Sequence, residues 1–503
     1  MRGLLLGACS LAALGIAVFT TPGCGSDDTS EFEGGTSGGP GDGGCSGFAC
    51  PPDEGGSNTP CVGLQCPQRE GAVCENGGST TLSGTVFDPA GKVPIYNATV
   101  YIPLSNDEPL AEITEGAATC DRCDATISGK PIAITTTDTS GNFTIAKAPF
   151  GANIPLVIQI GKWRRKVLIP NAGKCVATAV DAGITRLPRN STEGHIPRMA
   201  LTTGGADPLQ CLLRKIGIDD SEFGVAGSAA RIHLYAGGGF NSGGAKPASS
   251  KFGAALNGGA AFPAADTFWA AGASLKKYDV VLLSCEGDEN IATKPDPAKA
   301  AIYDYAKGGG RIFASHYHYA WFSKSPDAVV KGVATWAPVD VGTGFNERTP
   351  PAVPSNPATT AVNADISTAF PKAVAMNEWL TKQQALVGGK LPIFDARHNI
   401  DAVTANSLNW MSVTNPNVAA PNNKPPQYMT FNTPIGAAEA QVCGRVVVSD
   451  LHVGAGTGDD AQAAFPDGCS TQPLSAQQKA LEFMLFDLSS CIQKDNAPIV
   501  GPK

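Results

Sequence analysis

Residues 278–285 read YDVVLLSC, residues 311–318 read RIFASHYH, and residues 444–450 read GRVVVSD. Each is a short apolar run with polar residues at its ends, which is the pattern of a strand buried on both faces. Residues 298–307, between the first two runs, and residues 475–488, after the third, have helical periodicity. Buried strands that alternate with helices indicate a parallel sheet covered on both sides. The sequence therefore predicts a doubly wound α/β domain over residues 230–492.

A different pattern precedes this domain, from residue 81 to residue 185. Short runs alternate apolar and polar residues between turns rich in Gly and Asp, as in SGTVFD (83–88), ATVYI (98–102) and NFTI (142–145). Such a series predicts a small antiparallel β-sandwich. Residues 186–229 are then expected to connect the two domains.

The first 23 residues have the composition of an export signal. Arg2 precedes an apolar run from residue 3 to residue 20, which is too short and wrongly flanked for a permanent membrane span. The run closes on Thr21-Pro22-Gly23-Cys24. A small residue before a cysteine resembles the lipobox of bacterial lipoproteins, which implies a signal peptide over residues 1–23 and lipidation of Cys24. Ordinary secretion is the alternative.

The segments at the two ends of the mature chain are expected to lack a fold of their own. Residues 24–80 are rich in Gly, Ser, Pro and Cys, a composition that predicts a flexible tether. Residues 493–503 are expected to be a C-terminal tail. With the lipobox, this organisation implies a protein attached to the outer membrane or cell surface through its N-terminal lipid.

The charge of the chain limits the partners that we expect, and its cysteine content indicates the compartment. Charged residues make up 16% of the 503 residues and the net charge is −8, so we expect no nucleic-acid partner. Fifteen cysteines indicate an oxidising compartment. Without Cys9, which lies in the signal, and the lipidated Cys24, the number is odd, so one thiol is expected to be free or paired between chains.

The spacing of the cysteines suggests some pairings and leaves others open. The expected pairs are local loops for Cys45 with Cys50 and for Cys61 with Cys66, and a bond from Cys120 or Cys123 to Cys175 or another partner. Near the C-terminus, a disulfide is expected to join Cys443 and Cys491 to each other, or either of them to Cys469.

Two families share these patterns. The runs SGTVFDPAGKVPIYNATVYI, TTTDTSGNFTI and IPLVIQIGKWRRKVLI resemble the carboxypeptidase regulatory-like (prealbumin-type) domain, which implies a non-catalytic module. The order YDVVLLSCEG, AIYDYAKGGGRIFASHYH and GRVVVSDLH resembles the flavodoxin-like fold of class I glutamine amidotransferases, in the ThuA-like branch. Catalytic members carry Gly-x-Cys-x-Gly where this chain has Ala314-Ser315-His316-Tyr317-His318, so amidotransferase chemistry is not implied. The whole arrangement resembles uncharacterised myxobacterial lipoproteins.

Polar clusters follow three of the predicted strands. They are Cys285-Glu286-Gly287-Asp288, His316-Tyr317-His318 and Asp450-Leu451-His452. Ligands of a doubly wound sheet bind beyond the carboxyl ends of its strands, so these clusters are expected to meet if the strands are neighbours.

One interpretation of these clusters is a divalent metal site. Imidazole and carboxylate ligands suit Zn²⁺ and similar ions, and an open position could activate water. In an extended stretch, His-x-His points both rings to the same side. The predicted ligands are His316, His318, His452 and Asp450, with Glu286 or Asp288 as the alternative acidic ligand and Asp395 or His398 as possible additions.

The other interpretations are a thiol nucleophile and a site without chemistry. In the first, Cys285 attacks the substrate, His316 or His452 is the base, and Asp450 orients the base. In the second, Cys285 is a small core residue and the histidines bond to loop backbone. The leading expectation is a cell-envelope lipoprotein that binds a carbohydrate or an envelope protein without catalysis. The alternative is an exported metal-dependent or Cys-dependent hydrolase acting on a carbohydrate or a peptide-like substrate.

Overall fold

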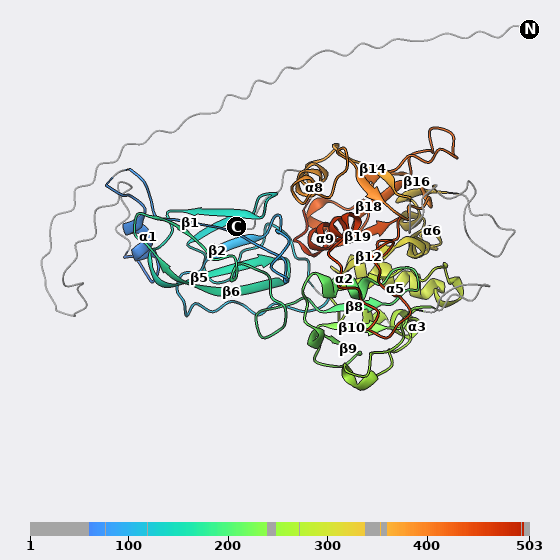
Figure 1. Ribbon diagram of the computed structural model, residues 1–503, viewed down its shortest axis with the longest axis horizontal. Coiled ribbons are helices and arrows are strands. Elements are labelled where there is room, and N and C mark those ends of the chain that lie inside the picture. The colour runs from blue at the N-terminus through green and yellow to red at the C-terminus, as the bar shows by residue number, and fades with distance from the viewer. Residues whose placement is uncertain are drawn as a thin grey trace, which may run out of the picture. The chain divides into compact units, whose positions relative to one another are not determined.

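The computed structural model describes residues 60–75, 77–117, 119–238, 248–270, 272–337, 353, 360–493 and 495–496. These residues cluster into one unit of mixed α/β structure (Figure 1). The export signal, Cys24, the pair Cys45 and Cys50, and residues 497–503 of the predicted tail lie outside the described residues. In the part of the chain that is described, no helix is long and apolar enough to cross a membrane.

The α/β part is built on a ten-stranded sheet that is mixed rather than parallel. Every pair from β19 to β9 is parallel, whereas the four strands on the other side of β19 pair antiparallel. The prediction of a parallel sheet is therefore correct only for the half from β19 to β9, because it missed the antiparallel pairing after residue 360. In spatial order the strands are β15 (Leu391–Ile393), β14 (Val362–Ile366), β17 (Leu408–Ser412), β18 (Pro426–Thr433), β19 (Gly444–Ser449), β12 (Arg311–Ser315), β11 (Val280–Leu283), β8 (Met199–Thr202), β10 (Ile232–Tyr235) and β9 (Phe223–Gly224).

Two smaller sheets come from the region predicted as an antiparallel sandwich. The four-stranded sheet is antiparallel throughout, in the order β3 (Ala133–Thr136), β2 (Thr99–Ile102), β5 (Gly151–Ile160) and β6 (Trp163–Ala172). The three-stranded sheet pairs β1 (Thr81–Thr85) antiparallel with β4 (Asn142–Ala146) and parallel with β7 (Ala177–Ala179). The small region is thus antiparallel except at the β1–β7 pair. A separate two-stranded sheet joins β13 (Ala334–Trp336) and β16 (Ile400–Val403).

Alternation along the central strands divides the core in two. On β11, Val280 and Leu282 face one core while Val281 and Leu283 face the other, as a period of two requires. The first core contains α8 (Pro371–Lys382) and α9 (Ala476–Ser489) and continues into the two small sheets, and the second contains α3 (Ala265–Ala270) and α5 (Asp296–Lys307). The short helices are α1 (Gln65–Gly71), α2 (Leu209–Lys215), α4 (Gly272–Leu275), α6 (Ala320–Ser323) and α7 (Ala328–Lys331).

The connecting segment and the end of the predicted tether are integrated into the folded domains. Residues 186–229 contribute β8 and β9 to the large sheet, and β8 pairs with both β10 and β11. Residues 60–80 of the predicted tether contain α1 and are bonded to the small sheets, because Cys74 forms a disulfide with Cys175. Both segments owe their order to partners distant in sequence, which local composition does not reveal.

Five disulfides are present among the described residues, and they agree with the expected pairings in part, since Cys120 and Cys123 pair with partners other than Cys175. Cys61–Cys66 is the local loop that the spacing predicts. The other four join distant segments, so the predicted bond between Cys443, Cys491 and Cys469 is wrong. These four are Cys74–Cys175, Cys120–Cys443, Cys123–Cys491 and Cys211–Cys469. The one free cysteine of the described residues is Cys285, which is buried.

A buried carboxyl group on α9 gives a prediction about stability. Neither oxygen of Glu482 has a hydrogen-bond partner among the described residues, and its side chain is fully buried. Burial, together with the nearby carboxyl of Asp88, raises the pKa of Glu482 well above its ordinary range. The folded protein therefore holds this proton more tightly than the unfolded chain, and its stability is expected to fall as the pH rises above about 4.3.

Replacing Glu482 by glutamine should raise the free energy of unfolding at pH 8 by about 1–3 kcal/mol, and by less at pH 5. Asp487 on the same helix is the control, because its carboxylate is paired with Lys372 and Arg445. Asp487→Asn should destabilise the protein. Denaturant titrations at both pH values measure the effect, and an equal or lower stability of Glu482→Gln at pH 8 would contradict it.

Candidate metal centre

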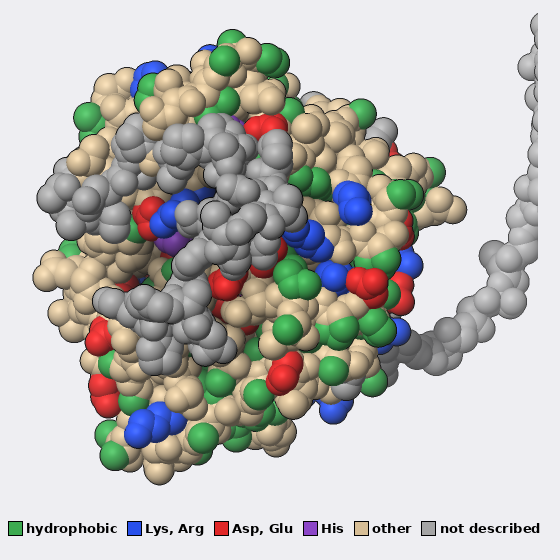
Figure 2. Space-filling model, turned by 90° about the vertical axis from the view of Figure 1, so that its right-hand side faces the viewer, with side chains coloured by type: hydrophobic (Ala, Val, Ile, Leu, Met, Phe, Trp, Pro, Cys, Tyr) green, Lys and Arg blue, Asp and Glu red, His purple; other side chains and the backbone are tan. Residues whose placement is uncertain are grey.

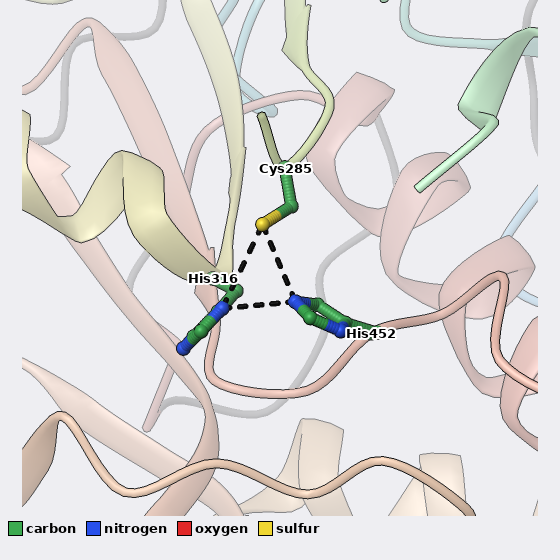
Figure 3. Close-up of side chains that lie close together, drawn as sticks. All are labelled: Cys285, His316 and His452. Atoms are coloured by element: carbon green, nitrogen blue, oxygen red, sulfur yellow. Dashed lines mark hydrogen bonds between the residues drawn. The ribbon is translucent and has the colours of Figure 1, made fainter. Parts of the chain in front are cut away.

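Three side chains from neighbouring strand ends meet at one point (Figure 3). Cys285 lies two residues after β11, His316 directly follows β12, and His452 lies three residues after β19. The three strands end at the same edge because β12 pairs in parallel with both β11 and β19. The strand ends that the sequence singled out therefore bring these three residues together.

The three donor atoms lie within contact distance of one another. The sulfur of Cys285 is 3.3 Å from Nε2 of His452 and 3.6 Å from Nδ1 of His316, and these two nitrogens are 2.9 Å apart. The side chains are nearly closed to solvent, since Cys285 is 0%, His316 2% and His452 7% exposed.

Each imidazole is held from its outer side by an oxygen acceptor. Nδ1 of His452 is 2.6 Å from a carboxylate oxygen of Asp395, and Nε2 of His316 is 2.9 Å from the side-chain oxygen of Asn399. A carboxylate and an amide oxygen accept hydrogen bonds, so we assign the ring proton of each histidine to its outer nitrogen. When both rings are neutral, the inner nitrogens present lone pairs to the sulfur and to each other.

Two lone pairs at 2.9 Å repel unless a positive charge lies between them. Either a proton shared by the rings or a metal ion would supply that charge. An outer carboxylate or carbonyl oxygen on each histidine is also the arrangement that orients histidine ligands in metal sites. The donor set and its outer hydrogen bonds therefore fit a metal ion.

The pKa values of the two histidines are shifted in opposite directions. Burial opposes a charge on His452, but the neighbouring Cys285 and Asp395 raise the pKa of His452 well above its ordinary value. Burial and the nearby charges of His452 and Arg397 lower the pKa of His316 well below its ordinary value. Although burial favours its neutral form, the charges of His452 and Arg397 lower the pKa of Asp395. In the metal-free centre His452 therefore carries a positive charge beside Asp395, while the ring of His316 stays neutral.

The backbone places both histidines by tight local turns. His316 has φ +29°, a left-handed value that non-glycine residues adopt rarely and at a cost. This turn joins β12 to the single 3₁₀ turn His316–Tyr319. The loop of His452 is held by Gln477 of α9, whose amide donates to the backbone carbonyls of His452 and the two residues Val453 and Ala455.

His318 does not belong to the centre, which corrects the predicted ligand set. Its Nε2 is 2.8 Å from the carbonyl oxygen of Ser284, and its Nδ1 accepts a hydrogen bond from Trp321. The prediction assumed an extended His-x-His, but residues 316–319 form a 3₁₀ turn, in which residues two apart point in different directions. Burial lowers the pKa of His318 to about 4.

Asp450 is also a structural residue rather than a ligand or an orienting partner. One of its carboxylate oxygens accepts hydrogen bonds from the backbone N–H groups of Asn399 and Ile400, at 2.7 and 3.2 Å. It therefore fixes the loop that carries Asn399. The residue that orients His452 is Asp395, which was predicted only as a possible additional ligand.

The remaining predicted residues are engaged elsewhere. Glu286 forms a buried ion pair with Lys294 at 2.6 Å and accepts the backbone N–H of Gly238. Asp288 accepts the backbone N–H of Glu289, and His398 pairs with Asp401 at 2.9 Å. None of the three joins the metal-ligating group found among the described residues.

Two buried polar residues near the centre were missed by the sequence argument. Asn399 holds His316, and Asp207, which follows β8, bonds to the residue before His316. No spacing rule links either of them to the histidines, because their segments meet only in the folded chain.

On the face in Figure 2, acidic and basic side chains are interspersed and only a small area of histidine surface is visible.

No protein-family model matches the chain, and no curated protein matches it. The chemistry of the site is therefore the basis for assigning a function. One thiol and two imidazoles suit borderline metal ions such as Zn²⁺. The same residues with Asp395 also form a Cys–His–Asp series, in which a thiol could act as a nucleophile.

Proposed function

We propose that the protein is an exported metalloprotein that binds Zn²⁺, or a similar divalent transition-metal ion, through Cys285, His316 and His452. The observation that carries the proposal is the close approach of the Cys285 sulfur to the inner ring nitrogens of His316 and His452, whose outer nitrogens are held by Asn399 and Asp395. A buried cation at that point would accept electron density from both rings and from the thiolate at once.

The distances between the donors support this choice. Tetrahedral zinc with Zn–S near 2.3 Å and Zn–N near 2.05 Å separates a sulfur and a nitrogen by about 3.6 Å and two nitrogens by about 3.3 Å. The sulfur–nitrogen distances are 3.3 and 3.6 Å, and the nitrogen–nitrogen distance is 2.9 Å. Binding would therefore spread the rings by a few tenths of an ångström, which side-chain rotation supplies.

A site with three protein ligands is typical of catalytic rather than structural zinc, because the fourth position remains for water or substrate. A metal ion in such a site acts as a Lewis acid and lowers the pKa of bound water. We therefore favour a metal-dependent hydrolase over the non-catalytic ligand-binding protein that the sequence made the leading expectation. A carbohydrate or a peptide-like compound stays the proposed substrate.

Removing and restoring the metal gives the first test. Protein stripped with a chelator should bind one Zn²⁺ per chain, and at a free concentration 100 times the dissociation constant the folded state should gain about 2.7 kcal/mol. Metal analysis and thermal denaturation report both effects. His318→Gln is the control, because His318 bonds outside the centre, and it should keep the full metal content.

Unchanged thermal stability on adding Zn²⁺, with no bound metal in the wild-type protein, would contradict the proposal. Loss of metal in His318→Gln but not in Cys285→Ser would return the assignment to the ligand set predicted from the sequence.

A thiol hydrolase is the second candidate, supported by the 3.3 Å contact of Cys285 with His452 and the 2.6 Å contact of His452 with Asp395. In this case the metal-free protein is the active form, and iodoacetamide should alkylate Cys285 rapidly and abolish hydrolysis. Prior loading with Zn²⁺ should leave the alkylation rate unchanged if the thiol binds no metal. Protection by Zn²⁺ would favour the metal centre.

We also propose that the protein works in the cell envelope, attached through a lipid on Cys24. The five disulfides support an oxidising compartment, because such bonds are rare in a reducing cytosol. The lipobox-like sequence before Cys24 supports the attachment. A carbohydrate or an envelope protein remains the proposed binding partner.

A further inference from the structure

Asp207 lies at a fourth strand end beside the centre. It follows β8, which pairs in parallel with β11, so it lies at the same edge of the sheet as Cys285. Its side chain is fully buried. The predicted mechanisms do not use it, and the sequence placed it in a connecting segment.

The carboxylate of Asp207 bonds to both segments that carry the histidines. One oxygen accepts a hydrogen bond from the hydroxyl of Ser315, the residue before His316. The other accepts the backbone N–H of Gly454, two residues after His452, at 2.8 Å. A single side chain thereby links the end of β12 to the loop after β19.

The close approach on the Gly454 side requires glycine. A Cβ atom at residue 454 would lie 2.5 Å from the ring of Pro208 and 3.3 Å from the carboxylate of Asp207. The first distance is shorter than any normal contact, so a larger residue would push the His452 loop away from Asp207. The hydrogen bond between Asp207 and Gly454 therefore depends on a glycine at residue 454 as well as on the carboxylate of Asp207.

The charge of Asp207 has no basic partner that contacts it in the described part of the chain. Its two hydrogen bonds come from neutral groups. Burial raises the pKa of Asp207, and the largest opposing effect is the charge of His452. A buried carboxylate without a counter-charge is costly, so a positive centre next to it would be stabilised.

The charged groups around the centre indicate that the partner of Asp207 would be a cation. With a metal ion bound, His452 would be neutral and Cys285 would bind as a thiolate, so Asp207, Asp395 and Cys285 would be three negative groups, and Arg397, which pairs with Asp395, would be one positive group. A divalent cation bound by the thiolate and the two neutral imidazoles would cancel the difference. Asp207 thus supplies part of the negative charge that a metal ion would require.

We propose that Asp207 is a positioning residue of the metal centre, which holds His316 and His452 at ligating separation and balances the charge of the bound ion. This inference rests on the proposed function. It predicts that Asp207 affects metal affinity separately from its effect on folding.

The test compares Asp207→Asn and Asp207→Ala with the wild-type protein in Zn²⁺ competition against a chelating indicator. Asparagine keeps an acceptor for Gly454 and removes the charge, so affinity should fall about 10- to 100-fold. Alanine also removes the link and should lower affinity further. The melting temperature of the metal-free Asp207→Asn protein should equal or exceed that of the metal-free wild type, because a buried charge has been removed.

Asp459→Asn is the matched control. Asp459 is also buried, but it pairs with Lys215 and accepts the backbone N–H of Ser470. This variant should lower the melting temperature and leave zinc affinity unchanged. The visible spectrum of the Co²⁺-loaded protein gives a second readout, since a displaced ligand shifts the thiolate-to-metal band in Asp207→Asn but not in Asp459→Asn.

The outcomes separate this inference from the proposed function. If the wild-type protein binds Zn²⁺ and Asp207→Asn binds it within twofold of wild type with the same Co²⁺ spectrum, the role of Asp207 is overturned and the proposed function stands. A lower melting temperature with unchanged affinity would likewise make Asp207 merely structural. Absence of Zn²⁺ binding by the wild-type protein would overturn both.

Discussion

Replacing His452 by alanine should lower the affinity of the protein for Zn²⁺ by about 100- to 1000-fold. Structural zinc sites bind with roughly 10–16 kcal/mol shared among four ligands, so one ligand contributes about 3–4 kcal/mol. His452 is central because its Nε2 contacts both Cys285 and His316, at 3.3 and 2.9 Å. Competition against a chelating indicator measures the change.

His318→Ala is the informative control for this prediction. The two histidines are both buried, and both follow strands of the same sheet, but the ring of His318 bonds to Ser284 and Trp321. Its loss should reduce thermal stability while zinc affinity stays within a fewfold of wild type. Equal losses of affinity in the two variants would mean that general loosening of the fold, rather than ligation, explains the result.

Removing the two disulfides that join residues 120–123 to the segments before β19 and after α9 should destabilise the protein by roughly 5 kcal/mol or more. Cys120–Cys443 and Cys123–Cys491 close loops with sequence separations of 323 and 368 residues. In the chain-entropy model, one crosslink over such a loop restricts the unfolded chain by about 6 kcal/mol, and the second, which closes a shorter remaining loop, adds about 4. Denaturant unfolding of the variant with all four cysteines changed to serine measures the loss.

The local disulfide provides the comparison. Cys61–Cys66 has a sequence separation of 5, so replacing both residues by serine restores little chain entropy. We expect that variant to lose much less stability than the fourfold variant. Similar losses from the two variants would show that loop closure is not the source of the stabilisation.

The convergence of Cys285, His316 and His452 could be predicted from the sequence for a simple reason. Apolar runs locate buried strands, and parallel neighbours bring their carboxyl ends to one edge. The sequence did not show which polar residues at those strand ends join the centre, because that depends on the local backbone conformation. His318 was expected to point with His316, but the 3₁₀ turn after β12 sends the two rings apart.

The supporting residues depend on contacts between distant segments. Asp395, Asn399 and Asp207 reach the centre from residues far from the histidines in sequence, and only Asp395 was considered. The predicted pairing of Cys443, Cys491 and Cys469 among themselves was wrong for the same reason, since spacing reveals local loops such as Cys61–Cys66 but not bonds across hundreds of residues. Three of the four antiparallel strands, β14, β17 and β18, were missed because these short strands lie within residues 360–433 between turns rich in Pro and Asn.

X-ray absorption spectroscopy of the Zn²⁺-loaded protein tests the metal centre most directly. We predict one sulfur ligand near 2.3 Å and two imidazole nitrogens near 2.0–2.1 Å, with the sulfur signal lost in Cys285→Ser. Zinc bound without a sulfur ligand, or no zinc retained by the purified wild-type protein, would contradict the assignment of Cys285, His316 and His452 as its ligands.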